Sequence, residues 1–382
     1  MIPYGRQSIS EADIEAVVEV LRSNFLTQGP VVPAFEQAFA QRVQASYAVA
    51  CNSATSALHL AYLALGVGPG DSVWTSPITF VATANAALYC GADVDFVDID
   101  ARTYNLCCDA LAEKLAQAER QGRLPKVVAA VHLAGQPCEM AAIAELSQRY
   151  GFAVVEDASH AVGARYRDEP VGNGRYSDIT VFSFHPVKIM TTAEGGLATT
   201  NQAQLAERMQ LLRSHGVTRD AQLLQAPDSG GWYYEQQALG FNYRLTELQA
   251  ALGLSQLQRL DAFLEARRQQ VARYQERLAS LPLQLPWQHP DSDSSYHLYP
   301  VCVADEPARA QLYQQMRAAA IGVNVHYIPV HTQPFYRARG FDWGDFPVAE
   351  DYYRRALSLP VYADLTSHDQ QSVVDVLVKA LG

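Results

Sequence analysis

Lys188 is the residue of this chain best placed for covalent chemistry. It follows a β-branched and aromatic run at residues 180–184 and precedes small residues that end in Gly195 and Gly196. A lysine at the end of a buried strand can become an uncharged amine, and such an amine can form a Schiff base with an aldehyde. The alternative is an ordinary solvated lysine with no chemical role.

A second feature is an acidic pair, Glu156 and Asp157, at the end of the apolar run 151–155. Ligands of open α/β sheets bind outside the carboxyl ends of the strands, and both Asp157 and Lys188 fall at such ends. Pyridoxal phosphate (PLP) chemistry needs this pairing, because the lysine carries the aldehyde and a carboxylate keeps the ring nitrogen protonated. Alternatively, Asp157 caps the next helix.

Small hydroxyl residues open a helix-forming stretch at residues 52–64, directly after the apolar run 47–51. Free backbone N–H groups and the positive end of the helix dipole make such a start a candidate phosphate site. Ser53 and Thr55 could equally serve only as helix caps. The glycine-rich run 66–70 follows a helix and precedes a strand, which is the wrong order for a dinucleotide-binding loop, so we interpret it as a turn.

Strands and helices alternate through the first half of the chain, which favours a mostly parallel sheet covered on both faces. We expect helices at 11–22 and 31–43, and strands near 47–51, 71–75, 93–97, 126–132, 152–157 and 178–184. A single long helix over 247–281 should lead to a smaller α/β domain with strands at 296–303 and 322–327, and loops at 225–231 and 287–295. The predicted domains are residues 1–245, and residues 246–382 with the bridging helix.

The bulk composition limits the function classes. Of 382 residues, 29 are Lys or Arg and 40 are Asp or Glu, so the net charge of −11 disfavours general attraction to nucleic acid or anionic membranes. The first residues have no signal-peptide layout and no apolar run approaches ~18 residues, so we expect a cytoplasmic protein. Six cysteines without a C-x-x-C pair indicate free thiols in a reducing compartment. His326 and His331 alone are too few ligands, and we assign no metal.

These residues lie within a longer series of segments that resembles a known family. The chain is similar to the sugar aminotransferases of the DegT/StrS type, which act on nucleotide-linked keto sugars and have the aspartate-aminotransferase fold (PLP fold type I). The matching segments are 26–29, 52–58, 77–85, 156–160, 183–188, 191–196 and 239–244. Segments 213–216, 294–300 and 325–330 look most like the members that aminate C4 of a UDP-linked 4-keto-6-deoxy-N-acetylhexosamine in pseudaminic acid biosynthesis.

The resemblance implies a role for each matching residue around the cofactor. Lys188 would form the internal aldimine and Asp157 would pair with the pyridine nitrogen. Phe80 would lie against the cofactor ring, with an ordinary core phenylalanine as the alternative. His160 would lie near the phenolic oxygen, or else be a structural histidine. The residues that would hold the phosphate are Ala54, Thr55, Ser183 and, from the neighbouring subunit of a homodimer with shared active sites, Asn242.

The resemblance also implies the substrates. The segments that would line the nucleotide-sugar pocket contain Tyr4, Asn24, Phe25, Leu26, Thr27, His326, Tyr327, Ile328 and Pro329. Arg244 could contact a diphosphate or form a structural ion pair. L-Glutamate would be the amine donor in a ping-pong reaction, with Lys188 moving the protons. The alternatives are another nucleotide-sugar C3 or C4 aminotransferase and a non-catalytic PLP-binding scaffold, whereas the glycine fingerprint of nicotinamide enzymes is missing.

Overall fold

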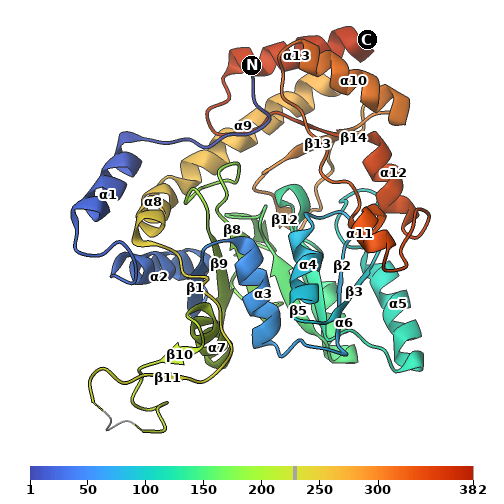
Figure 1. Cartoon of the computed structure of the whole chain (residues 1–382). Coiled ribbons are helices and arrows are strands. Elements are labelled where there is room, and N and C mark those ends of the chain that lie inside the picture. The colour runs from blue at the N-terminus through green and yellow to red at the C-terminus, as the bar shows by residue number, and fades with distance from the viewer. Residues whose placement is uncertain (227–229, 382) are drawn as a thin grey trace.

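A seven-stranded sheet forms the centre of the molecule (Figure 1) in this computed structural model, which describes residues 1–226 and 230–381. Its strand order is β1-β9-β8-β5-β4-β2-β3. The strands are β1 (Tyr47–Cys51), β2 (Ser72–Thr75), β3 (Asp93–Phe96), β4 (Val127–Val131), β5 (Ala153–Asp157), β8 (Ile179–Ser183) and β9 (Gly196–Thr200). All neighbours pair in parallel except β9, which runs antiparallel to β1 and β8. The predicted mostly parallel α/β fold is confirmed, and β9 is a strand that the sequence analysis did not predict.

Helices cover both faces of this sheet because its strands are apolar on both sides. All five residues of β4 are buried. Val127 and Ala129 pack with the helices of one face, and Val128 and Ala130 pack with those of the other. The first face carries α3 (Ala54–Ala64), α4 (Ala82–Tyr89) and α7 (Ala203–Arg213). The second face carries α5 (Cys108–Gln121) and α6 (Met140–Tyr150), and also α2 (Val31–Val43).

Charged side chains cover the outer strand at each edge of the sheet. At β1, Glu36 accepts a hydrogen bond from Ala50 N at 2.7 Å, and Arg213 donates to Ala50 O at 2.7 Å and pairs with Glu36. At β3, Lys114 donates to Phe96 O and pairs with Asp95 at 2.7 Å. Edge strands with unpaired backbone groups invite pairing with other chains, so these contacts protect the fold against edge-to-edge association.

The C-terminal third forms a second, smaller core. Its two-stranded sheet of β13 (Tyr299–Cys302) and β14 (Ala356–Leu359) packs with α9 (Leu260–Leu278), α10 (Glu306–Ala318) and α13 (Ser367–Leu381). The first residues of the chain also belong here, since Ile2 pairs with Ile321 (Figure 1). The division at residue 245/246 stays a prediction. The helix that follows it, α8 (Glu247–Gln258), packs on α2 and on α1 (Glu11–Arg22), which both precede the predicted division in the sequence.

Several predicted elements differ from the structure. The single helix expected over 247–281 is two helices, α8 and α9, separated at Arg259, whose side chain is held by Asp13 and Ser8. The strand expected at 322–327 is reduced to one bridge between Asn324 and Ser358, and the one at 296–303 is shortened to β13. The loop expected at 287–295 contains β12 (Ser292–Asp293). Of the loop expected at 225–231, residues 227–229 lie outside the described residues.

The remaining elements are short. They are two 3-10 helices, η1 (Leu133–Gly135) and η3 (Val330–Thr332), with β6 (Arg165–Tyr166), β7 (Glu169–Pro170), β10 (Val217–Thr218), β11 (Glu235–Gln236), α11 (Pro334–Arg337) and α12 (Pro347–Arg355). β10 and β11 pair in a hairpin that extends away from the sheet at the lower left of Figure 1. In the part of the chain that the structure describes, none of the helices has the length and apolar character needed to cross a membrane.

Candidate active site

A cavity of about 500 Å³ lies where β4, β5 and β8 end, beside the first residues of α3. This is the carboxyl edge of the parallel strands, where open α/β sheets bind their ligands. The cavity brings together ten of the residues predicted from the sequence: Tyr4, Ala54, Thr55, Phe80, Asp157, His160, Ser183, Lys188, His326 and Tyr327. Those that do not line it in this single chain are Asn24, Phe25, Leu26, Thr27, Asn242, Ile328 and Pro329.

Asp157, the last residue of β5, provides the carboxylate of the cavity. It is 5% exposed. Its Oδ2 accepts a hydrogen bond from Thr83 Oγ1 at 2.6 Å, and its Oδ1 accepts one from Ser159 N at 3.1 Å. Asp157 forms no ion pair within residues 1–226 and 230–381, so its donors are a hydroxyl and a backbone amide. An N–H group of a bound ring could join them as a further donor.

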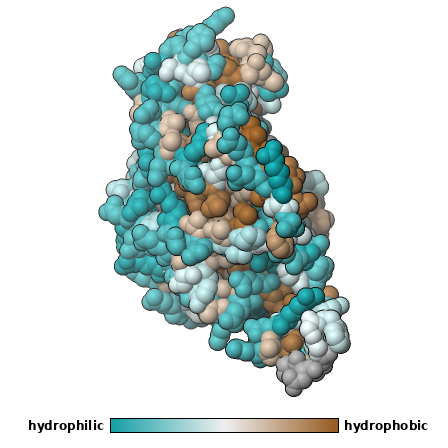
Figure 2. Space-filling view, turned by 90° about the vertical axis from the view of Figure 1, so that its left-hand side faces the viewer, coloured by the Kyte–Doolittle hydropathy of each residue, from teal (hydrophilic) through white to brown (hydrophobic). Residues whose placement is uncertain are grey.

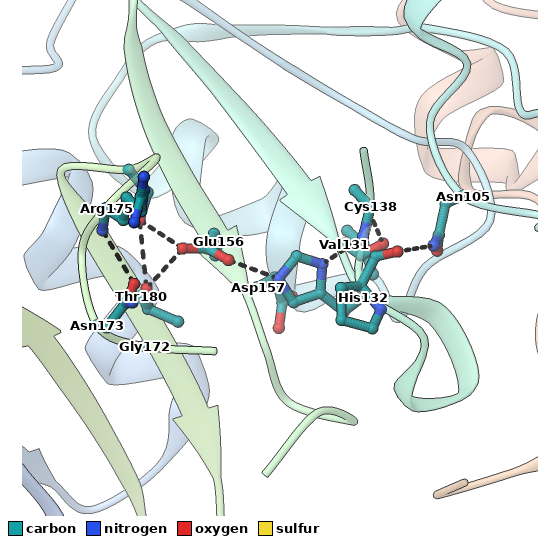
Figure 3. A network of polar contacts seen from close by, with 12 residues as sticks. Asn105, Val131, His132, Cys138, Glu156, Asp157, Gly172, Asn173, Arg175 and Thr180 are labelled. Atoms are coloured by element: carbon teal, nitrogen blue, oxygen red, sulfur yellow. Dashed lines mark hydrogen bonds and ion pairs between the residues drawn. The ribbon is translucent and has the colours of Figure 1, made fainter. Parts of the chain in front are cut away.

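The other member of the acidic pair, Glu156, belongs to a separate buried network (Figure 3). His132 Nδ1 accepts a hydrogen bond from Cys138 N, so Nε2 carries the hydrogen and donates to Glu156 at 2.7 Å. Burial opposes ionisation of Glu156, but the hydrogen bonds from His132, Ser177 and Thr180 outweigh it and lower its pKa. Neighbouring residues of a strand face opposite sides of the sheet. Glu156 therefore has a structural role, and only Asp157 serves the cavity.

Lys188 lies in the turn after β8, where its backbone N donates to His185 O at 2.9 Å. Its side chain is partly buried, and within the described residues its amine has no hydrogen-bond or ion-pair partner. Burial lowers the pKa of Lys188 to about 8, and the charge of Asp157 only partly opposes this shift. A substantial fraction of this amine is therefore uncharged near neutral pH and can attack an aldehyde.

The start of α3 forms a cradle for an anion. Ser53 is the N-cap, because its side chain accepts from Ser56 N at 3.1 Å, and both Ser53 and Thr55 line the cavity. A Cβ atom on Gly196 would lie only 2.4 Å from Ala54 N. β9 therefore lies so close to the start of α3 that only glycine fits at position 196. With Ser183 and the first N–H groups of α3, this arrangement suits a phosphate monoester.

Phe80 presents its ring to the cavity. It is 59% exposed, so the core-phenylalanine alternative was wrong. A flat ligand ring could pack against it. These four features are complementary to pyridoxal 5'-phosphate. The primary amine suits its aldehyde, the carboxylate its ring nitrogen, the start of α3 its phosphate, and the exposed aromatic ring its flat ring.

Two histidines also line the cavity, and both are uncharged. His160 has a pKa well below its usual value because it is buried and lies near Lys188 and His326. Its Nδ1 accepts from Ala134 N, so Nε2–H donates to Tyr327 Oη at 3.0 Å and leaves the tyrosine hydrogen free for a ligand. Burial lowers the pKa of His326 to about 3, and its Nδ1 lies 2.9 Å from Ser358 Oγ.

Some residues of the cavity were not predicted, and several predicted residues, Ile328 and Pro329 among them, do not line it. Thr79, Thr83, Ser159, His185, Glu194 and Asn324 line it as well. Asn242 lies beside Asn52, and residues 24–27 connect α1 with α2, where Phe25 and Leu26 are about half exposed. Figure 2 views the molecule from the left-hand side of Figure 1, where α1 and α2 lie, and shows apolar surface across the middle of that face.

Known proteins similar to this chain share both the fold and the length. A spore coat polysaccharide biosynthesis protein of Bacillus subtilis, SpsC, is 40% identical over 98% of this chain and 96% of its own. The UDP-4-amino-4,6-dideoxy-N-acetyl-beta-L-altrosamine transaminase of Campylobacter jejuni is 37% identical over 100% of this chain and 98% of its own. The structure of Helicobacter pylori PseC, an aminotransferase involved in the biosynthesis of pseudoaminic acid, has a TM-score of 0.91 and 31% identity over 100% and 99% of the two chains.

The fold and the site define an aminotransferase of PLP fold type I, as the sequence predicted. Residues 7–378 match the family model of the DegT/DnrJ/EryC1/StrS aminotransferases, and the chain belongs to this family. Its members depend on PLP, and the similar solved structures include a PLP form and a PMP form. The protein is therefore a PLP-dependent sugar aminotransferase.

Proposed function

We propose that this enzyme moves an amino group from L-glutamate to C4 of a UDP-linked 4-keto-6-deoxy-N-acetylhexosamine. The observation that carries the proposal is the convergence of Lys188, Asp157 and the start of α3 on one cavity. The activity of the Campylobacter transaminase and the pathway of Helicobacter PseC support a sugar of pseudaminic acid biosynthesis as the substrate.

The cofactor would be held by groups with complementary chemistry. The first N–H groups of α3, with Thr55 and Ser183, would bind its phosphate, and Phe80 would lie against its ring. Asp157 would accept a hydrogen bond from the ring nitrogen. When bound, PLP supplies an electron sink and a temporary carrier for the amino group.

Lys188 would perform the proton transfers of both half-reactions. In the first, its uncharged amine would take the proton from the α-carbon of glutamate and pass it to the cofactor carbon that receives the amino group. In the second, it would take a proton back from that carbon and deliver it to C4 of the sugar. A base with a pKa near the working pH is effective in both directions, and the lowered pKa of Lys188 meets this requirement. A positioned base of this kind contributes about 100- to 10,000-fold to the rate.

The sugar nucleotide would bind at the end of the cavity formed by Tyr4, His326 and Tyr327. The free hydroxyl hydrogen of Tyr327 can meet a sugar oxygen. Because both histidines here are uncharged, they act as polar and not as ionic contacts. The cavity thus recognises sugar groups through neutral hydrogen bonds.

A second copy of the chain would complete the site in a homodimer. Among the described residues that line the cavity of one chain, Lys188 is accompanied by the two carboxylates of Asp157 and Glu194, so binding a diphosphate requires further positive charge. Asn242 lies outside the cavity of its own chain. Arg244, two residues further on, has a buried Nε without a hydrogen-bond partner among the described residues, and in the dimer it would supply this positive charge to the neighbouring cavity. The exposed apolar residues 25 and 26 fit an interface between subunits.

The proposal is tested by incubating the purified protein with PLP, glutamate and a panel of UDP- and dTDP-linked keto sugars. Mass spectrometry and NMR then identify the product. We expect 2-oxoglutarate and a UDP-linked 4-amino sugar. Amination of only a C3-keto or a dTDP-linked sugar would refute the specific substrate and favour another nucleotide-sugar aminotransferase, and cofactor binding without any amine transfer would favour the scaffold alternative.

Two lysine variants form a matched pair for this assay. Lys188→Ala removes the amine of the cavity, whereas Lys379→Ala removes an exposed amine on α13. We expect the first variant to lose turnover and the second to retain it. Full turnover by Lys188→Ala would overturn the assignment.

A further inference from the structure

A chain of buried hydroxyl groups leads to the carboxylate of Asp157. Thr79 Oγ1 lies 2.9 Å from Thr83 Oγ1, which lies 2.6 Å from Asp157 Oδ2. The two threonines are 2% and 0% exposed. Both line the cavity, so the chain reaches Asp157 at its wall.

The directions of these hydrogen bonds follow from the number of hydrogens. A threonine hydroxyl has a single hydrogen, and an ionised carboxylate can only accept. Thr83 therefore donates its hydrogen to Asp157, and Thr79 must donate to the oxygen of Thr83. A hydroxyl that accepts one hydrogen bond becomes a better donor for the next, so Thr79 strengthens the bond from Thr83 to Asp157.

These donors compensate for the burial of the carboxylate. A buried carboxylate without a partner is costly, and within the described residues Asp157 has no ion pair. Its charge is stabilised by two donors, the hydroxyl of Thr83 and the backbone N–H of Ser159 at 3.1 Å. Hydrogen bonds to charged groups are about twice as strong as neutral ones, so the loss of the Thr83 hydroxyl would be felt at Asp157.

The same turn of chain also carries Phe80, whose ring is exposed to the cavity. The backbone N of Thr83 donates to Phe80 O at 3.3 Å. The position of the aromatic ring and the orientation of the carboxylate are thus fixed by one short segment, residues 79–83.

We propose that Thr83, supported by Thr79, is a positioning residue that orients the Asp157 carboxylate towards the ring nitrogen of bound PLP and thereby keeps the proton on that nitrogen. The inference rests on the proposed function of Asp157. Without the Thr83 hydroxyl, Asp157 would lose one of its two donors and its fixed orientation, and its hydrogen bond with the ring N–H would weaken. The electron-accepting capacity of the site would then fall although Asp157 is still present.

The test uses the holoenzyme reconstituted with PLP that carries ¹⁵N in its ring. The ring-nitrogen chemical shift is recorded by NMR at neutral pH, and PLP affinity is measured by fluorescence titration. We expect Thr83→Val to move the shift from the protonated towards the unprotonated position and to raise the Kd for PLP about tenfold or more. Thr83→Ser retains the hydroxyl and should keep both values close to those of the wild type.

Two further variants separate positioning from stability. Thr75→Val removes another fully buried hydroxyl, one that donates to Ala129 O at 2.9 Å and does not touch Asp157, and should leave the ring-nitrogen shift unchanged. Thr79→Val should move the shift in the same direction as Thr83→Val but by less, and it provides the test if Thr83→Val fails to fold. Wild-type protein that binds no labelled PLP would refute the proposed function itself. Binding with the same shift in every variant would overturn only the role of Thr83.

Discussion

The lowered pKa of Lys188 predicts an unusually reactive amine. With a pKa of about 8, about one quarter of this side chain is uncharged at pH 7.5, whereas a lysine with the ordinary value of 10.5 would be about 0.1% uncharged. The difference is about 200-fold in the reactive form. The cause is burial, since the charge on Asp157, the one that acts on Lys188 among the described residues, raises the pKa.

The perturbation that tests this cause is Asp157→Asn, which removes the opposing charge and nearly keeps the shape. We expect the pKa of Lys188 to fall further below 8 in this variant, because the stabilisation of the charged amine is lost. The assay is competitive acylation of the cofactor-free protein over a range of pH, with peptide mass spectrometry to measure labelling of each lysine. The chain has four lysines, so Lys379, exposed on α13, provides an internal reference.

The labelling curve of Lys188 should have its midpoint near pH 8 in the wild type and at a lower pH in the variant. A midpoint near 10.5 would refute the argument that burial uncharges this amine. A shift to higher pH in Asp157→Asn would show that the two groups do not interact as the structure indicates.

Two further predictions concern the frame around the site. Gly196→Ala places a Cβ atom 2.4 Å from Ala54 N, so we expect a loss of about 1–3 kcal/mol in stability and weaker PLP binding. Gly68→Ala, which meets nothing within 4 Å, is the control, and equal effects of both on PLP affinity would contradict the cradle. Glu156→Gln breaks the network with His132 and should cost about 2 kcal/mol at pH 7 in urea unfolding. Folding lowers the pKa of Glu156, so its contribution to the free energy of unfolding is complete above about pH 4.5 and is lost as the pH falls through the lowered value. A difference in the free energy of unfolding between wild type and variant that stays constant down to pH 3 would argue against this role.

Much of the sheet could be predicted because its strands are short apolar runs between helices. The six predicted strands of the large sheet agree with the structure to within one residue at each end. β9 was missed because its sequence, Gly-Leu-Ala-Thr-Thr, has few large apolar residues, and its burial depends on the neighbours β1 and β8. The break between α8 and α9 was also missed, since helix propensity continues through Arg259 and only tertiary contacts to Asp13 and Ser8 mark the boundary.

The site could be predicted where a residue with a suitable reactive group stands at or just after the end of a predicted strand. Asp157 ends one strand and Lys188 follows another, so the parallel sheet brings them to one edge. The hydroxyl of Thr83 was missed because its significance depends on a hydrogen bond to a residue 74 positions away. Only its spacing of three residues from Phe80 could have indicated that both face the cavity. The contributions of Asn242 and of residues 24–27 depend on a second chain and stay predictions.

The central claim is that Lys188 holds PLP at the cavity that Asp157 lines. It is tested most directly by reducing the PLP-loaded protein with borohydride and mapping the modified peptide by mass spectrometry. We predict a single pyridoxyl-modified lysine, Lys188, in the native protein once free PLP has been removed, and no preference for Lys188 over the other three lysines when the protein is denatured before PLP is added and reduced. Stable attachment at Lys114, Lys126 or Lys379 instead, or at no lysine of the native protein, would contradict the account.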